Sequence, residues 1–215
     1  MNKIFLLIII LLFNLSIVFG QNKIGIPLFN DNYTKTVQKL ENGETDIDYK
    51  AFRENFIESE QFKVASKMND EFKELTEKMY KQMSAKDFDG VISTTQQMLS
   101  IDYTSMKAHK ILRQTYNIIG DTLNAEKYKT IQFGLLRSIV DNGDGKSCEN
   151  GWPIIQISEE YFILDMLDVK LIGQSIVNEN GLCDRMEVQD ENGNKTTYYF
   201  EISNVFKGRN NLKKQ

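Results

Sequence analysis

The residues best suited to chemistry in this 215-residue chain lie in one short stretch, residues 141–152, which reads "DNGDGKSCENGW". Glycines, acidic side chains, a lysine and a serine follow one another closely there, as they do in phosphate-binding and calcium-binding loops. We therefore treat the stretch as a candidate loop site, whose residues are Asp141, Asp144, Lys146, Ser147 and Glu149.

The phosphate-binding motif is incomplete in this stretch. The motif requires a glycine, four further residues and then Gly-Lys-Ser or Gly-Lys-Thr, placed between a strand and a helix. Residues 145–147 supply Gly-Lys-Ser, but the position of the first glycine holds Val140. The preceding sequence has a helical pattern and Pro153 follows soon after, so neither neighbour fits. We do not expect nucleotide binding at this loop.

The calcium-binding motif is incomplete as well. An EF-hand loop needs an acidic first position, a glycine at the sixth and a glutamate at the twelfth. If Gly145 is the sixth residue, Val140 is the first and Gly151 the last, so both key ligands are missing. The sequence leaves open a looser calcium site on Asp141, Asp144 and Glu149, since calcium accepts varied oxygen ligands. We favour a helix end followed by a turn, because glycines commonly close helices.

Other kinds of reactive site have little sequence support. His109 is the only histidine, and a zinc site would need it to meet Cys148 and Cys183 without any closely spaced ligand pair. We predict no catalytic residue, no metal and no cofactor. The two cysteines are candidates for a disulfide, but the sequence does not show whether their backbones approach closely enough.

The first 20 residues predict export. Lys3 is followed by an apolar run over residues 4–12 and by small residues before Gln21, which is typical of a cleaved secretory signal. A membrane anchor is the alternative, but the run is shorter than a span prefers. We expect a periplasmic or extracellular protein with no membrane span in the mature chain. The net charge of -4 argues against nucleic acid as a partner.

Apolar residues at helical spacing predict the elements that precede the loop. A first helix is expected at residues 46–59, capped by Asp46 or Asp48. Four stripes with short polar breaks then predict antiparallel helix hairpins. The stripes are Phe72, Leu75, Met79 and Met83; Phe88, Val91, Ile92, Thr95, Met98 and Leu99; Ala108, Ile111, Leu112, Thr115 and Ile119; and Tyr128, Ile131, Leu135 and Ile139.

The helical block also repeats weakly, with a period of about 34 residues that is typical of tetratricopeptide helix pairs. The segment 109–125 fits that motif best, with His109 at the place of its first aromatic residue. Stacked helix pairs form a concave face. We therefore name His109 and Gln114 as candidate groove residues.

Strand-like sequence follows Val140, with a hairpin signal at Asn192-Gly193 and one short helical segment, "EEYFILDML". We expect Trp152 to pack between the two halves. The predicted class is α+β, with tetratricopeptide-like hairpins followed by a small antiparallel sheet. The expected parts are a signal peptide (1–20), an irregular segment (21–45), a tetratricopeptide-like helical region (46–142), an antiparallel β region (143–206) and a polar tail (207–215).

The wording of the chain resembles one family, the exported bacterial domain-of-unknown-function family 4919. The resemblance rests on "DYKAFRENFIES", on "SIVDNGDGKSCENGWPIIQISEEYFIL", on "GQSIVNENGLCDRMEV" and on "YYFEIS". It implies an export signal and a helical half followed by a sheet half. It implies no activity.

These observations favour a non-catalytic exported module that binds a protein or peptide at the helical face or at the junction. One alternative is a hydrolase that uses carboxylates at the helix–sheet junction, from Asp141, Asp144, Glu149 and Asp184. Another is a purely structural envelope protein, which would have neither groove nor ligand pocket.

Overall fold

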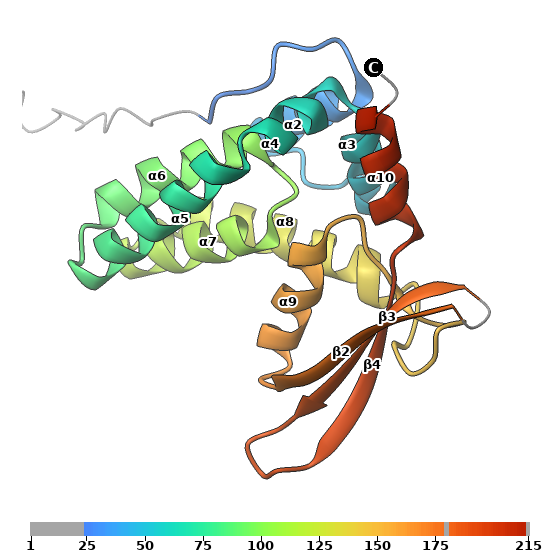
Figure 1. Cartoon of the computed structure of the whole chain (residues 1–215). Helices are drawn as coiled ribbons and strands as arrows, with labels where there is room; N and C mark the ends of the chain where they lie inside the picture. The colour runs from blue at the N-terminus through green and yellow to red at the C-terminus, as the bar shows by residue number, and fades with distance from the viewer. Residues whose placement is uncertain (1–23, 179–180, 214–215) are drawn as a thin grey trace, which may run out of the picture.

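The computed structural model describes residues 24–178 and 181–213. In this part of the chain a series of helices is followed by a small sheet, which confirms the predicted α+β class (Figure 1). The predicted signal, residues 1–20, lies outside the described residues. Among the described helices, none has the length and apolar character that crossing a membrane requires.

Helix α2 (Asn32–Glu41) corrects the expectation that residues 21–45 are irregular. The Asp31 side chain caps the helix by accepting a hydrogen bond from the Thr34 amide, 2.7 Å away. Tyr33 and Val37, on one face, are buried in the main core. This stripe is short and lies among polar residues, so composition hid it.

Helices α3 (Tyr49–Glu58) and α4 (Glu60–Lys67) occupy the place of the first predicted helix and extend beyond it. The Asp48 side chain accepts from the Ala51 amide at 2.9 Å, so the cap is Asp48. Phe52 is buried and stacks on Tyr33 with ring centroids 5.3 Å apart. The aromatic stripe of α3 thus holds α2 against the helical part.

The four apolar stripes form two helix pairs that pack against each other. The helices are α5 (Asn69–Ser84), α6 (Phe88–Ile101), α7 (Met106–Ile119) and α8 (Thr122–Val140). Asp87, Ser105 and Asp121 cap the last three. Gly120 ends α7 in the left-handed conformation, with φ of 81°, which glycine adopts without strain. Figure 1 shows the two pairs side by side.

The sheet contains β1 (Trp152–Pro153), β2 (Lys170–Asn178), β3 (Leu182–Gln189) and β4 (Lys195–Glu201), in the order β1-β4-β3-β2. The pairs β2–β3 and β3–β4 are antiparallel, but β1 pairs with β4 in parallel. The sheet is therefore mixed, which corrects the antiparallel prediction. The two-residue β1 is too short to reveal its direction in the sequence.

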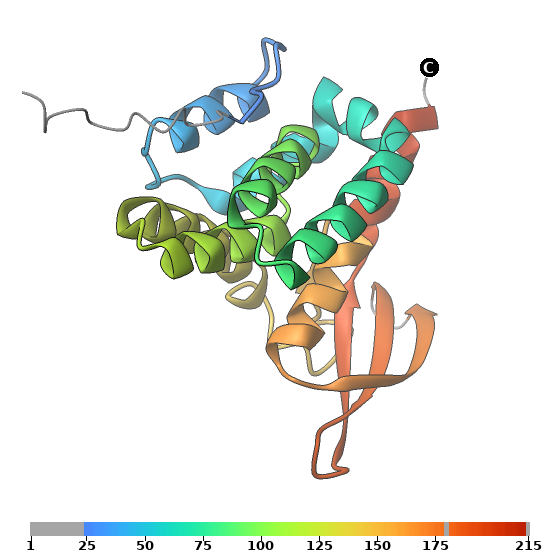
Figure 2. The same cartoon turned by 90° about the vertical axis from the view of Figure 1, so that its left-hand side faces the viewer.

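Helix α9 (Ile157–Met166) lies between the helical part and the sheet, where it contacts α7 and β2 (Figures 1 and 2). Its residues Phe162, Ile163 and Leu164 belong to the same buried core as the helices and the inner strands. The two halves therefore share one core, and α9 links them.

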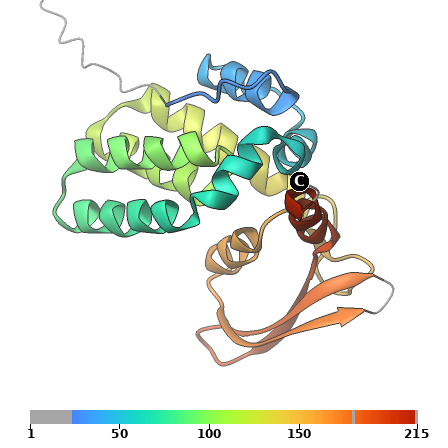
Figure 3. The same cartoon turned by 45° about the horizontal axis from the view of Figure 1, so that its top comes forward.

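Helix α10 (Ser203–Lys213) corrects the expectation of a polar tail over residues 207–215. It packs beside α3, as Figures 1 and 3 both show. A Cβ on Gly208 would lie only 3.1 Å from the ring of Phe62 on α4 and 3.6 Å from Ile57 on α3, so α10 approaches α4 closely because residue 208 has no side chain. Val205 and Gly208 supply the buried contacts in an otherwise polar helix.

Candidate functional site

Two side chains of the predicted loop site accept hydrogen bonds from backbone amides of the same loop. Asp144 Oδ1 accepts a hydrogen bond from the Lys146 amide at 2.9 Å, and Ser147 Oγ accepts one from the Asn150 amide at 3.3 Å. Asp141, Asp144, Lys146 and Glu149 are exposed, and Ser147 is half-buried. The loop residues therefore point to solvent or to one another, as expected of a turn.

The glycines and Trp152 give this loop a structural role. Gly145 has a φ of 67°, and a Cβ there would lie 2.8 Å from the Trp152 ring. The Trp152 indole Nε1 donates to the Gly143 carbonyl at 3.0 Å, and its ring stacks on Tyr198 with centroids 5.2 Å apart. The loop thus ends α8 and seats the buried Trp152 between the helices and the sheet.

Cys148 and Cys183 form a disulfide, with Cα atoms 5.7 Å apart. The bridge ties the loop to β3, across 35 residues of sequence. In the described ranges, no group of three or more histidine, cysteine, aspartate or glutamate residues is arranged to hold a metal ion. The looser calcium set of Asp141, Asp144 and Glu149 is therefore not such a group.

Of the two groove residues named from the repeat pattern, the structure contradicts His109. His109 is fully buried, and its Nε2 lies 2.8 Å from the Tyr103 carbonyl oxygen, to which it donates. Burial lowers the pKa of His109 to about 4, so the ring is neutral near pH 7. The ring packs between Tyr103 and Tyr128, where a partner cannot reach it. Gln114 is exposed, but it does not line the cleft described next.

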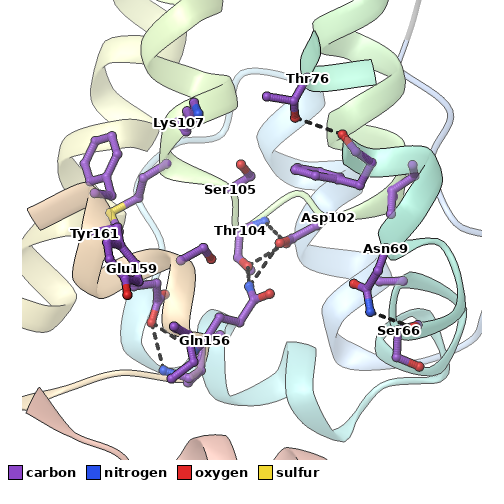
Figure 4. Close-up of a pocket in the computed structure, with 18 of the residues that line it drawn as sticks. Ser66, Asn69, Thr76, Asp102, Thr104, Ser105, Lys107, Gln156, Glu159 and Tyr161 are labelled. Atoms are coloured by element: carbon purple, nitrogen blue, oxygen red, sulfur yellow. Dashed lines mark hydrogen bonds between the residues drawn. The ribbon is translucent and has the colours of Figure 1, made fainter. Parts of the chain in front are cut away.

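A cleft of about 800 Å³ lies on another face of the helical part. Six of the described helices line it, and their residues come from distant parts of the sequence (Figure 4). Helix α4 contributes Phe62, Ala65 and Ser66; α5 contributes Asn69, Phe72, Thr76 and Tyr80; α6 contributes Ile101; α7 contributes Met106, Lys107, Lys110 and Ile111; α9 contributes Ile157, Ser158, Glu159, Tyr161, Phe162 and Asp165; α10 contributes Val205, Arg209 and Leu212.

The floor of the cleft holds a polar network that is internally satisfied. Asp102 Oδ1 accepts from the Thr104 amide at 2.8 Å and from its hydroxyl at 2.6 Å. Asp102 Oδ2 accepts from Gln156 Nε2 at 3.0 Å, and Figure 4 shows the three side chains together. Burial raises the pKa of Asp102, while these donors act against the shift. The network joins the end of α6 to the start of α9.

A buried ion pair holds the start of α9 in place. Arg53 Nε and Nη2 donate to the two Glu159 carboxylate oxygens at 2.8 and 2.7 Å, and both side chains are at most 4% exposed. Glu159 Oε2 also accepts from the Ile155 amide at 2.8 Å. Arg53 Nη2 donates in addition to the Pro153 carbonyl at 3.1 Å. The pair thus joins α3, the β1 segment and α9, which positions one wall of the cleft.

The rim of the cleft carries basic side chains. The Lys107 ammonium lies 5.0 Å from the centre of the Tyr80 ring, and the Arg209 guanidinium lies 5.6 Å from the Phe206 ring. Lys110 forms an ion pair with Asp165 at 2.7 Å. The walls between these cations are formed by Phe72, Met106 and Phe162, among other apolar residues.

A pair of buried acids, Glu160 on α9 and Asp184 on β3, lies between that helix and the sheet. Glu160 is fully buried and both of its carboxylate oxygens lack a hydrogen-bond partner. Burial, together with the charges of Asp184 and Glu159, raises the pKa of Glu160 to about 8. Asp184 accepts from Gln174 Nε2 at 2.5 Å, and burial raises its pKa too. Neither Glu160 nor Asp184 lines the cleft.

The cleft could not be predicted from the sequence because the residues that line it lie far apart along the chain and form no local motif. The apolar stripe of α7 is the one local indication, since Lys107 and Lys110 lie beside the buried face of that helix. Nothing local indicated that α9 and α10 would close the other sides.

The described residues form an α+β protein in which helices line a cleft beside a small mixed sheet. The match of a family model to residues 29–211 identifies the family: the chain belongs to the family described as Domain of unknown function (DUF4919). Comparison with curated proteins and with solved structures found no match.

Proposed function

We propose that this protein is an exported, non-catalytic module that binds a protein segment or peptide in the cleft. The observation that supports the proposal most directly is the cleft itself, about 800 Å³ in volume and lined by aromatic and aliphatic side chains. Clefts of about 300–1,000 Å³ with apolar walls and few polar groups are typical ligand sites.

The wall residues are suited to recognition rather than to chemistry. Tyr80 and Tyr161 are 45% and 47% exposed, which leaves aromatic surface free to be covered by a partner. The buried acids Asp102 and Glu159 are already bonded to their own neighbours. Satisfied groups of this kind shape a site without offering a free base or nucleophile.

The disulfide supports the proposed location. Such bridges persist in oxidising compartments, so the Cys148–Cys183 bridge agrees with a periplasmic or extracellular protein. The net charge of -4 supports a protein or peptide partner over nucleic acid.

The hydrolase alternative would require a pocket that contains two or more carboxylates of the junction. Asp141, Asp144, Glu149 and Asp184 are all absent from the lining of the cleft. The alternative of a purely structural envelope protein would leave the exposed aromatic rings of the cleft without a role. Neither alternative has an observation that favours it.

Peptide display against the purified chain tests the proposal. We expect random-sequence peptides to be enriched on the wild-type chain and to bind through the cleft. Tyr80→Ala and Phe72→Ala should weaken an enriched peptide by about tenfold each, because aromatic side chains dominate such contacts. The matched control is Ile118→Ala, an apolar residue on α7 that is 64% exposed and does not line the cleft.

Either of two results would refute the proposal. If display yields no peptide, or if the control variant weakens binding as much as the cleft variants, the cleft is not a peptide site. Unfolding midpoints of all three variants, measured by circular dichroism, separate a loss of contact from a loss of fold.

A further inference from the structure

We propose that the cleft selects an acidic segment, with one carboxylate at the Lys107 end, a second at the Arg209 end and apolar residues between them. This inference rests on the proposed function and adds the chemistry of the partner.

The first observation is the presence of two cations without ionic partners at the rim. Lys107 and Arg209 are exposed, and within the described residues neither is in an ion pair. Lys107 lies against the ring of Tyr80, which itself lines the cleft; Arg209 also lines the cleft, and its guanidinium lies against the Phe206 ring on the same helix. A partner can therefore meet both cations without first displacing a carboxylate of this chain.

The acids that line the cleft are already used. Asp165 is paired with Lys110, and Glu159 with Arg53. Asp102 has no cationic partner among the ion pairs of the described residues, but it is buried, and its carboxylate accepts hydrogen bonds from Thr104 and Gln156. Two unpaired cations remain, although the chain as a whole has a net charge of -4. The cleft rim is thus locally basic on an acidic protein, and this contrast favours an anionic ligand there.

The backbone of α7 adds to the effect at the Lys107 end. Ser105 and Met106, where α7 begins, line the cleft, and the first turn of this helix contains no acidic residue. The partial positive charge of the helix start is therefore not offset by its own side chains. In α9 the first turn carries Glu159 and Glu160, so the same argument does not apply there.

The two cations come from different walls of the cleft, Lys107 from α7 and Arg209 from α10. Lys107 sits against Tyr80, whereas Arg209 follows Gly208, which packs on the Phe62 ring of α4. Figure 4 shows Lys107 on one side of the pocket and Ser66 and Asn69, at the end of α4 and start of α5, on the other.

Helix α5 lines the cleft from Asn69 to Tyr80, a distance of about 16 Å at the usual rise of about 1.5 Å per residue. An extended peptide advances about 3.3 Å per residue, so two acids about five positions apart reach both ends. Phe72, Met106 and Phe162 line the space between them and suit apolar side chains.

The test uses defined peptides and a charge reversal. The probe is a blocked peptide, acetyl-Asp-Leu-Ala-Leu-Ala-Asp-amide, compared with the same peptide carrying asparagine or lysine at both ends. We expect isothermal titration calorimetry to show that the wild-type chain binds the aspartate peptide about tenfold or more tightly than the asparagine peptide, and that high salt narrows the difference in affinity.

The double variant Lys107→Glu with Arg209→Glu should lose this preference and favour the lysine peptide. The matched control is Lys129→Glu with Lys195→Glu, two exposed lysines outside the cleft lining, which makes the same change in net charge. Equal unfolding midpoints for the two double variants show that both are folded. The control should keep the preference of the wild-type chain.

Three outcomes would overturn the inference, and they differ from one another. If display-selected peptides bind through Tyr80 but lack acids, the partner chemistry is wrong and the proposed function stands. If the control reversal abolishes the preference as fully as the cleft reversal, net charge rather than the cleft explains the selection. If no peptide binds the wild-type chain, the proposed function fails and this inference fails with it.

Discussion

The ion pair between Arg53 and Glu159 should be among the costliest contacts to break. Both side chains are at most 4% exposed and meet through two hydrogen bonds of 2.7 and 2.8 Å. Replacing Arg53 by methionine leaves the Glu159 carboxylate buried, with the Ile155 amide at 2.8 Å as its main remaining donor. Removing one partner of such a pair lowers the free energy of unfolding by about 3–5 kcal/mol, because an uncompensated charge stays in the core.

A double-mutant cycle separates this effect from a simple loss of packing. Glu159→Gln alone leaves the Arg53 cation with the Pro153 carbonyl and the Ser138 side chain. The double variant Arg53→Met with Glu159→Gln has no buried charge at this place. We expect its loss of stability to be about 1–3 kcal/mol smaller than the sum of the two single losses.

Urea unfolding followed by two signals measures the cycle. Trp152 is the only tryptophan and lies at the junction, so its fluorescence reports on the sheet end. Far-ultraviolet circular dichroism reports mainly on the helices. The ion pair joins α3 to the β1–α9 segment, so the Arg53→Met chain should lose its fluorescence signal at lower urea than its helical signal.

The control is Glu60→Gln, which removes a surface pair whose side chains are 57% and 30% exposed. It should change the free energy of unfolding by less than about 1 kcal/mol. If Arg53→Met costs no more than this control, or if the cycle shows no coupling, the ion pair does not stabilise the junction and the reasoning is refuted.

Three further outcomes are expected from other parts of the core. Replacing Cys148 and Cys183 by serine should lower the free energy of unfolding by about 2–4 kcal/mol, because the bridge restricts the unfolded chain across 35 residues; thiol labelling of the native protein before reduction would contradict the bridge. The pKa of Glu160 is raised from 4.5 to about 8. Its contribution to the free energy of unfolding is therefore fully present below about pH 4.5 and is lost as the pH rises through about 8. Glu160→Gln should flatten that decline in urea titrations, and an unchanged decline would rule out this residue as its source. The pKa of His109 is lowered from 6.5 to about 4, so its contribution is present above about pH 6.5 and is lost as the pH falls through about 4; His109→Phe should remove this acid loss, and an equal loss in the variant would assign it to other groups.

The helices with continuous apolar stripes could be predicted from the sequence, and the weakly marked ones could not. Helix α8 buries Ile131, Leu135 and Ile139, a spacing that is unambiguous in the sequence. Helix α10 buries only Val205 and Gly208, and its other contacts depend on how closely α3 and α4 approach. Long-range packing, which a local pattern does not contain, decides the structure of such segments.

The candidate site was harder to predict than the fold for the same reason. The loop at Asp144 attracted attention because acids and glycines are close in sequence, yet its polar groups bond to their own loop. The cleft instead depends on contacts such as Arg53–Glu159, whose partners are 106 residues apart. His109 illustrates a third limit, since the sequence suggested an open groove for a polar side chain that the structure buries in the core.

The docking of α10 on α3 makes the cleft depend on a helix that follows the sheet in the chain. Val205, Arg209 and Leu212 form one wall of the cleft, and they belong to the last described helix. During synthesis the helices that form the other walls emerge first, so Phe62 stays uncovered on that side until α10 emerges. A chain cut before Ser203 would therefore expose an open, apolar half of the cleft.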